Sequence, residues 1–265
     1  MPLVFSAIMP HPPVLIPEIG KDNLKKLKKT EDAMKQLEKD FYASQPESLV
    51  IISTQEKVSP DSFTLNLSAE YKADFKDFGD FGLELKFKSD FMSMQEIRSA
   101  DESNDTVAIV LSSEERLEHG FSVPLYFLTQ HIKDIPIIPV AYSGLDYQAH
   151  YDFGKFLYDQ LASLNKRFAV VASADLSHTL TKDAPGGLNE KGKEFDDQVI
   201  AALKKKDFKS LVEMDPKLAE EAKESGLRSI LILLGMLDSL DVDPNVMSYE
   251  GPFGVGYAVC NLNLK

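Results

Sequence analysis

The stretch "RFAVVASADLSHTL", residues 167–180, joins an apolar run of strand length to a polar turn that ends in His178. The run is apolar throughout, which is typical of a strand buried on both faces of a parallel sheet. Asp175, Ser177 and His178 follow directly after it. Open α/β sheets bind their ligands at the carboxyl ends of such strands. The stretch therefore predicts the fold class and the place of a site.

Similar runs recur along the chain, at 3–9, 48–53, 107–111, 135–142 and 255–264. Between them, helical spacing of apolar residues occupies 21–44, 146–164 and 192–205. Strands that alternate with helices predict an α/β fold with a central, mostly parallel sheet flanked by helices. We expect one domain over residues 1–265, because the sequence contains no internal repeat and no low-complexity linker.

Residues 61–105 break this rhythm. Phenylalanine alternates there with aspartate and lysine, as in "YKADFKDFGDFGLELKFKSDF". Such alternation indicates half-buried antiparallel strands at one edge of the sheet. A lid over a site would fit the same pattern. The polar stretch "SADESNDT", at 99–106, predicts a solvated loop.

The composition excludes several classes of function. The chain has 29 Lys and Arg against 42 Asp and Glu, a net charge of −13, which argues against a nucleic-acid partner. Its one cysteine, Cys260, allows no internal disulfide and fits a cytoplasmic location. No apolar run approaches the roughly 20 residues that span a bilayer, and the N-terminus lacks the pattern of a signal peptide. We therefore expect no membrane partner.

His11 lies in "IMPHPPVLIPEIG", residues 8–20, after the first predicted strand. The prolines on both sides fix the backbone and hold this histidine in an extended loop. A loop histidine without function is the alternative. His11 and His178 would share one edge of a parallel sheet, and imidazole is the usual group for metal ligation and proton transfer.

The other histidines divide into two kinds. His119 comes just before a helix expected to begin near Val123, and Gly120 would allow a ligand to approach the backbone closely. His131 and His150 are interpreted as surface or internally satisfied histidines.

Several catalytic motifs are absent from the sequence: G-x-S-x-G, C-x-x-C and H-E-x-x-H. The remaining candidates are the histidines, with Asp175 in the turn before His178 and Glu224 ahead of an apolar helix. Histidines with one carboxylate make up a mononuclear metal site such as the 2-His-1-carboxylate arrangement.

Seven stretches, in this order, resemble one protein family. The chain is similar to the class III extradiol ring-cleavage dioxygenase (LigB-like) superfamily, in the Memo-like branch, also called the AmmeMemoRadiSam system protein B branch. The stretches that carry the resemblance span nearly the whole chain: "MPHPPVLIPEIG", "SFTLNL", "LEHGFSVPLYFL", "ASADLSHTL", "NEKGKEFDDQVI", "ESGLRSILILLG" and "YEGPFGVGYAV".

The resemblance implies an α/β fold and a non-haem metal, usually Fe(II), held by two histidines and a glutamate. His11 matches the first histidine ligand and Glu224 the glutamate. His178 resembles the acid/base histidine, and His119 a histidine that contacts substrate or oxygen. Asp175 and Ser177, in the same motif as His178, are expected to bind substrate.

The chain departs from the family pattern at the second histidine ligand. That position falls on Gln55, and the sequence has no histidine between His11 and His119. A glutamine offers only a neutral carbonyl oxygen, which binds Fe(II) or Zn less well than imidazole. The resemblance therefore implies a degenerate metal site.

Two functions follow from the resemblance. The first is an Fe(II)-dependent oxidoreductase that opens the ring of a catechol-like aromatic small molecule. The second is a non-catalytic Memo-like protein that binds a small molecule or metal and acts with an AMMECR-type protein and a radical SAM protein. The sequence leaves a homo-oligomer open.

Overall fold

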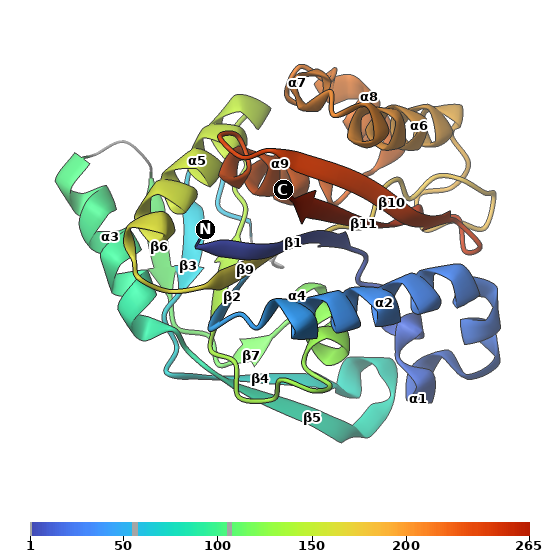
Figure 1. Cartoon of the computed structure of the whole chain (residues 1–265). Helices are drawn as coiled ribbons and strands as arrows, with labels where there is room; N and C mark the ends of the chain where they lie inside the picture. The colour runs from blue at the N-terminus through green and yellow to red at the C-terminus, as the bar shows by residue number, and fades with distance from the viewer. Residues whose placement is uncertain (1, 55–57, 105–107) are drawn as a thin grey trace.

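Four parallel, almost completely buried strands form the centre of the molecule. They are β1 (Leu3–Met9), β9 (Phe168–Ser173), β2 (Ser48–Ser53) and β8 (Ile137–Ala141). These are the continuous apolar runs of the sequence, since a strand covered on both faces needs apolar residues on both. The computed structural model describes residues 2–54, 58–104 and 108–265 (Figure 1).

The central strands belong to an eight-stranded sheet in the order β10-β11-β1-β9-β2-β8-β3-β6. β11 pairs antiparallel with β1 and with β10, and β3 pairs antiparallel with β8 and parallel with β6. The outer strands are β10 (Val242–Glu250), β11 (Tyr257–Leu264), β3 (Phe63–Asn66) and β6 (Ile109–Ser112). The prediction of one α/β domain with a mostly parallel sheet is confirmed.

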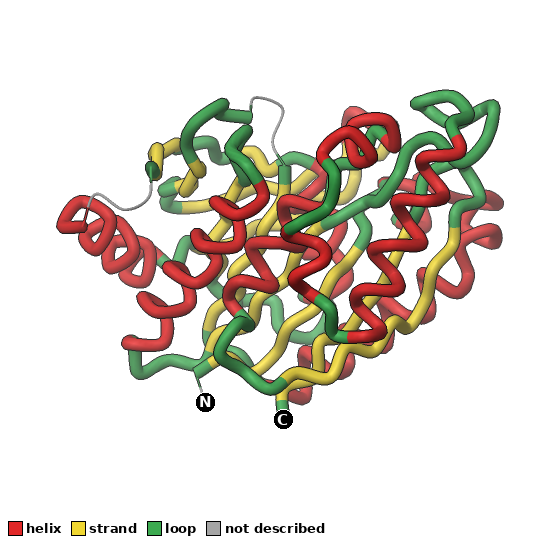
Figure 2. The backbone as a smooth tube through the Cα atoms, turned by 90° about the horizontal axis from the view of Figure 1, so that it is seen from above, coloured by secondary structure: helices red, strands yellow, loops and turns green. Residues whose placement is uncertain are grey.

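Helices cover both faces of this sheet, and each face has its own hydrophobic core (Figures 1 and 2). One core takes residues from α3, α5, α6, α7, α8 and α9, and the other from α2 and α4. The helices are α1 (Pro17–Gly20), α2 (Lys28–Ser44), α3 (Phe91–Asn104), α4 (His119–Leu128), α5 (Tyr147–Ser163), α6 (Glu190–Lys205), α7 (Phe208–Val212), α8 (Pro216–Ala222) and α9 (Leu227–Met236). Short 3-10 turns are η1 (Pro13–Leu15), η2 (Lys21–Leu27) and η3 (Lys76–Phe78).

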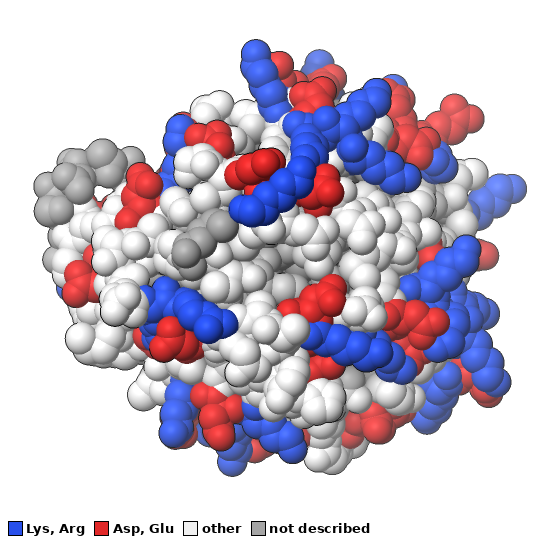
Figure 3. Space-filling view, in the orientation of Figure 1, with Lys and Arg blue, Asp and Glu red and all other residues white. Residues whose placement is uncertain are grey.

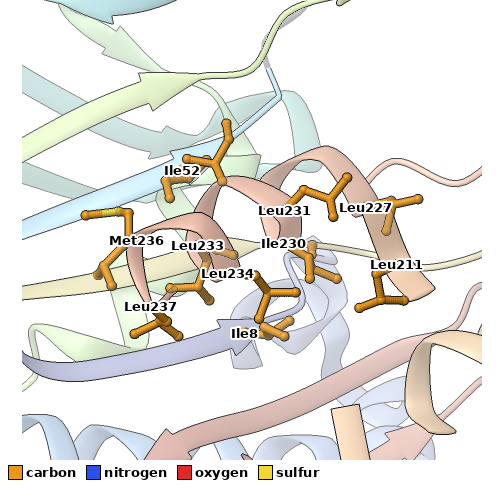
Figure 4. Packing of buried hydrophobic residues seen from close by; sticks show 14 of the residues in the cluster. Ile8, Ile52, Leu211, Leu227, Ile230, Leu231, Leu233, Leu234, Met236 and Leu237 are labelled. Carbon is orange, nitrogen blue, oxygen red and sulfur yellow. The ribbon is translucent and has the colours of Figure 1, made fainter. Parts of the chain in front are cut away.

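Helix α9 lies on the sheet with apolar residues on every side. Figure 4 shows Ile230 and Leu234 close to Ile8, with Ile52 on the other side of the helix. Each fully buried leucine or isoleucine contributes about 2 kcal/mol of transfer free energy. A helix that is apolar on all sides is buried on all sides. The packing of α9 on the sheet holds the loop before it against the ends of the central strands.

The segment 61–105 contributes to two sheets and one helix. β3 enters the large sheet, whereas β4 (Glu70–Phe75) and β5 (Asp80–Lys88) form an antiparallel hairpin that joins β7 (Arg116–Leu117) in a separate three-stranded sheet. The antiparallel strands expected from the alternation are present, but β4 and β5 lie outside the main sheet. They pack on the core that contains α2 and α4.

Two local predictions were wrong. Residues 99–104 continue α3 rather than forming a loop, because Met94 and Ile97 are buried one turn apart and hold the helix to the core. α4 begins at His119 rather than near Val123. It ends at Leu128, so His131 lies beyond it.

Charges on the face drawn in Figure 3 are mixed, with Lys and Arg lying among Asp and Glu. Several ion pairs of the molecule join helix residues four positions apart, such as Lys28 with Asp32. Within the described ranges, no helix combines the length and apolarity that crossing a membrane requires.

Candidate functional site

The ends of β1 and β9 are joined by hydrogen bonds just beyond the sheet. The backbone N–H of Ala174 donates to the carbonyl of Met9 at 2.9 Å, and that of His11 donates to Oδ1 of Asp175, also at 2.9 Å. Parallel pairing brings Met9 beside Ser173. His11 and Asp175, which are 164 residues apart in sequence, therefore meet at the carboxyl edge of the sheet.

The side chain of His11 is held in one tautomer. Its Nδ1 lies 2.9 Å from Oγ of Ser173, and the hydroxyl of Ser173 donates to the carbonyl of Gly120. That carbonyl is open to the serine because Pro124, four residues on in α4, has no N–H to donate to it. Since the serine proton is committed, Nδ1 of His11 must carry the donated hydrogen. Nε2 keeps its lone pair.

Burial shifts the pKa values of His11 and Asp175 away from their ordinary values. Burial, and next the charge of His178, lower the pKa of His11 to about 3, so this imidazole is neutral at physiological pH. Burial raises the pKa of Asp175 to about 6. Nε2 of His11 and Oδ2 of Asp175 are 3.8 Å apart, too far for a hydrogen bond. Asp175 therefore forms no hydrogen bond with the lone pair on Nε2 of His11.

His119 is the first residue of α4 and lies against His11. The centroids of the two imidazole rings are 5.5 Å apart, and the rings meet edge to face. Burial, and next the charge of His11, lower the pKa of His119. On its other side the ring contacts Phe78, with centroids 5.3 Å apart. His119 therefore links the buried cluster to the surface.

In its neutral form, His178 also presents a lone pair on Nε2. Its Nδ1 is 3.1 Å from the carbonyl of Leu176, and a carbonyl only accepts, so Nδ1 carries the hydrogen. Its backbone N–H donates to the carbonyl of Ala222 at 2.9 Å, which fixes the turn. His178 is half-buried and close enough to influence the pKa of both His11 and Asp175.

Glu224 is placed beside this turn but is occupied as a helix cap. Its Oε2 accepts hydrogen bonds from the N–H groups of Gly226 at 2.8 Å and Leu227 at 2.6 Å, at the start of α9. Its Oε1 lies 3.9 Å from the guanidinium of Arg228. Burial raises the pKa of Glu224. Gly226 packs directly on the backbone of Asp175, where a side chain would collide.

Ser177 does not face the cluster. Its backbone N–H and its hydroxyl both donate to the carboxylate of Asp196 on α6, at 2.9 and 3.0 Å. Tyr249 donates to the same carboxylate at 2.6 Å. Ser177 thus anchors the turn to α6, and the substrate contact expected of it stays a prediction.

The structure brings together four of the residues expected at the site: His11, His119, Asp175 and His178. In the part of the chain that the structure describes, no group of three or more His, Cys, Asp or Glu side chains is arranged to hold a metal ion. Gln55 lies outside the described residues. The metal roles of His11, Glu224 and Gln55 therefore stay predictions.

The two remaining histidines are structural. His150 is fully buried, and its Nδ1 donates to the carbonyl of Asp146 at 2.6 Å while its Nε2 accepts from the N–H of Ser143 at 3.3 Å. His131 is exposed and pairs with Glu38. Both match the interpretation from the sequence.

Sequence reasoning missed Ser173 as a residue of the site. The signal was present, because "FAVVAS" ends an apolar strand with one polar residue that is completely buried. A buried hydroxyl at the end of such a strand needs a partner, and here the partners are His11 and Gly120. Phe78 was missed as well, because no local pattern shows that the β4–β5 hairpin folds back to His119.

Comparison with known proteins identifies the family of the chain. Residues 6–260 match the family model described as the catalytic LigB subunit of aromatic ring-opening dioxygenase. The chain is 32% identical over 264 residues to Protein CA_C1420 of Clostridium acetobutylicum; the match covers 96% of this chain and 56% of the relative, so the chain spans little more than half of that protein.

A likeness to a solved structure supports the fold. The crystal structure of uncharacterized protein JW3007 from Escherichia coli K12 matches 98% of this chain and 100% of that one, with a TM-score of 0.64 and 15% sequence identity. With the family match over nearly the whole length, and with His11 and His178 at the carboxyl edge of the sheet, the chain belongs to the LigB family of aromatic ring-opening dioxygenase subunits.

Proposed function

We propose that the cluster of His11, His119, Asp175 and His178 binds a catechol-like aromatic and accepts the proton of its hydroxyl group. The single observation that carries this proposal is the pair of fixed tautomers, which leave Nε2 of both His11 and His178 as acceptors. A phenolic hydroxyl is a donor, and a general base must reach its hydrogen directly. The family description, an aromatic ring-opening dioxygenase, supports the substrate class.

The residues have separate roles in this proposal. His178, half-buried on its turn, accepts the hydrogen of the substrate hydroxyl at Nε2 and holds it on the ring. Ser173 keeps His11 in the tautomer that offers Nε2. Asp175 fixes the backbone of His11 through Oδ1. We assign to the described residues of this cluster the binding and proton-accepting steps.

Titration calorimetry with 4-methylcatechol tests the proposal. We expect wild type to bind and the His178→Ala variant to bind at least about tenfold more weakly, a loss of roughly 1.4 kcal/mol. His131→Ala, which removes an exposed histidine far from the cluster, is the matched control and should bind like wild type. Equal affinity in wild type and His178→Ala would rule out the role given to His178.

A second candidate is the non-catalytic Memo-like protein, and the presence of Gln55 at the position of the family's second histidine ligand favours it. Such a protein would bind a small molecule or metal and act in the cytoplasm with an AMMECR-type protein and a radical SAM protein. Oxygen uptake with 4-methylcatechol and added Fe(II) separates the candidates. Oxygen consumption supports the ring-opening oxidoreductase, whereas binding without consumption supports the non-catalytic protein.

A further inference from the structure

A hollow of about 680 Å³ opens beside His119. Its walls come from the small sheet and its connections, from the end of β3, and from the first turns of α4. His119 lies in this wall and also contacts His11. The hollow therefore lies next to the cluster of the proposed function, with His119 between them.

Aromatic rings form part of the wall of the hollow. Phe78, His119 and Phe121 all contribute to it, and the ring of Phe78 meets that of His119 edge to face. Phe78 is 39% exposed, so much of its ring is free to contact a ligand. It ends the turn η3, where Gly79 adopts a φ of +87° that allows the chain to reverse into β5. Rings placed in this way favour a flat aromatic ligand.

The charges of the hollow are predominantly negative. Asp74, Asp77, Glu114 and Glu118 contribute carboxylates, and Arg116 is the one cation of the described lining. Arg116 is already paired, with its guanidinium 3.1 Å from Asp74 and 2.5 Å from Asp77. A ligand carboxylate would have to displace one of these pairs and approach the remaining acids. A ligand ammonium group would meet complementary charge.

We propose that this hollow is the substrate-recognition subsite of the LigB-type site and that it selects aromatic molecules with a cationic side chain over those with a carboxylate. The ring lies against Phe78 and His119, and the cationic group points toward Asp77 and Glu114. This inference rests on the proposed function for the hydroxyl-bearing end of the ligand. The preference for a cationic side chain over a carboxylate depends on the residues of the hollow alone.

A pair of matched probes without hydroxyl groups tests the subsite by itself. Binding of phenethylamine and of phenylacetate is measured by calorimetry at low salt, with the NMR signals of the His119 ring as a local readout. We expect phenethylamine to bind at least about tenfold more tightly and to shift those signals, with the preference shrinking as salt screens the charges. Equal or tighter binding of phenylacetate overturns the proposal, and so does the absence of any shift at His119 with both probes.

Variants locate the effect. Asp77→Asn with Glu114→Gln removes two lining carboxylates and leaves Arg116 paired with Asp74 alone, so the preference for phenethylamine should fall to within about twofold. Glu115→Gln is the matched control, because Glu115 lies on the same segment but pairs with Lys72 outside the lining. A preference that survives the double variant, or falls equally in the control, overturns the assignment.

The hydroxylated pair separates this inference from the proposed function. Dopamine and 3,4-dihydroxyphenylacetate carry the same side chains on a catechol ring. If dopamine binds no more tightly than phenethylamine and His178→Ala changes neither, the proposed function fails while the charge-selective subsite stands. If both catechols bind through His178 without discrimination by charge, the proposed function stands and the subsite fails.

Discussion

Two buried histidines, His11 and His150, lie in different regions and look alike by burial alone. Both are nearly inaccessible, and burial lowers the pKa of each, to about 3 for His11 and to about 4 for His150. They differ in their partners. Both ring nitrogens of His150 are hydrogen-bonded within α5 and the loop before it, whereas Nε2 of His11 lies 3.8 Å from Oδ2 of Asp175 and keeps its lone pair. An unfilled acceptor, rather than burial, distinguishes His11 from His150.

The largest expected effect is on stability, and it concerns His150. His150→Ala removes two buried hydrogen bonds and the edge contact with Phe63, so we expect the free energy of unfolding to fall by about 3 kcal/mol. The half-buried His178 is the counterpart, and His178→Ala should cost about 1 kcal/mol. Urea unfolding measures both. A larger loss in His178→Ala than in His150→Ala would break the comparison.

The pH dependence of stability sharpens the comparison. The unfolded chain protonates His150 near its ordinary pKa of 6.5, whereas burial holds the folded pKa at about 4, so the unfolded state binds more protons between these values. Stability is therefore lost as the pH falls from 6.5 toward 4, by about 3 kcal/mol for this group. His150→Gln removes the titration, and the slope of unfolding free energy against pH should decrease by close to one proton. An unchanged slope would contradict the buried, neutral state of His150.

Much of the site could be predicted from strand ends. His11 and His178 each follow a continuous apolar run, and parallel strands bring their carboxyl ends to one edge, as the sequence predicted. The sequence pattern could not predict the direction in which each side chain points. Glu224 and Ser177 lie in motifs of the resemblance, yet both are committed to neighbours, Glu224 to the N-terminus of α9 and Ser177 to Asp196.

The fold shows the same limit. Strands of the main sheet were predictable because burial on both faces leaves an apolar run. The β4–β5 hairpin was visible as alternation, but its departure from the main sheet depends on long-range packing against α4. The contact of Phe78 with His119, two residues far apart in sequence, arises from that packing.

The next expected effect concerns Gln55, which lies outside the described residues. If it occupies the second ligand position of the family, Gln55→His restores a strong nitrogen donor, and affinity for Fe(II) or Zn should rise at least about tenfold. Metal titration of wild type and variant at equal protein concentration measures this. Tight binding of one Fe(II) by wild type would show that other residues complete the site.

The smallest effect tests the tautomer of His11. Ser173→Ala removes the acceptor of Nδ1–H, and we expect a stability loss of about 1 kcal/mol together with a mixture of His11 tautomers in nitrogen-15 NMR. His178 provides the internal control, since its Nδ1–H is bound to the carbonyl of Leu176 and should stay as it is. A single, unchanged His11 tautomer in this variant would remove Ser173 from the account.

The most direct test of the central claim is a titration of nitrogen-15 histidine-labelled wild type with 4-methylcatechol, followed at the ring nitrogens. The account predicts that the Nε2 signals of His11 and His178, which are open acceptors, shift on binding, while both nitrogens of His150 stay where they are. Equal shifts at His150, or binding with no shift at His11 and His178, would contradict it.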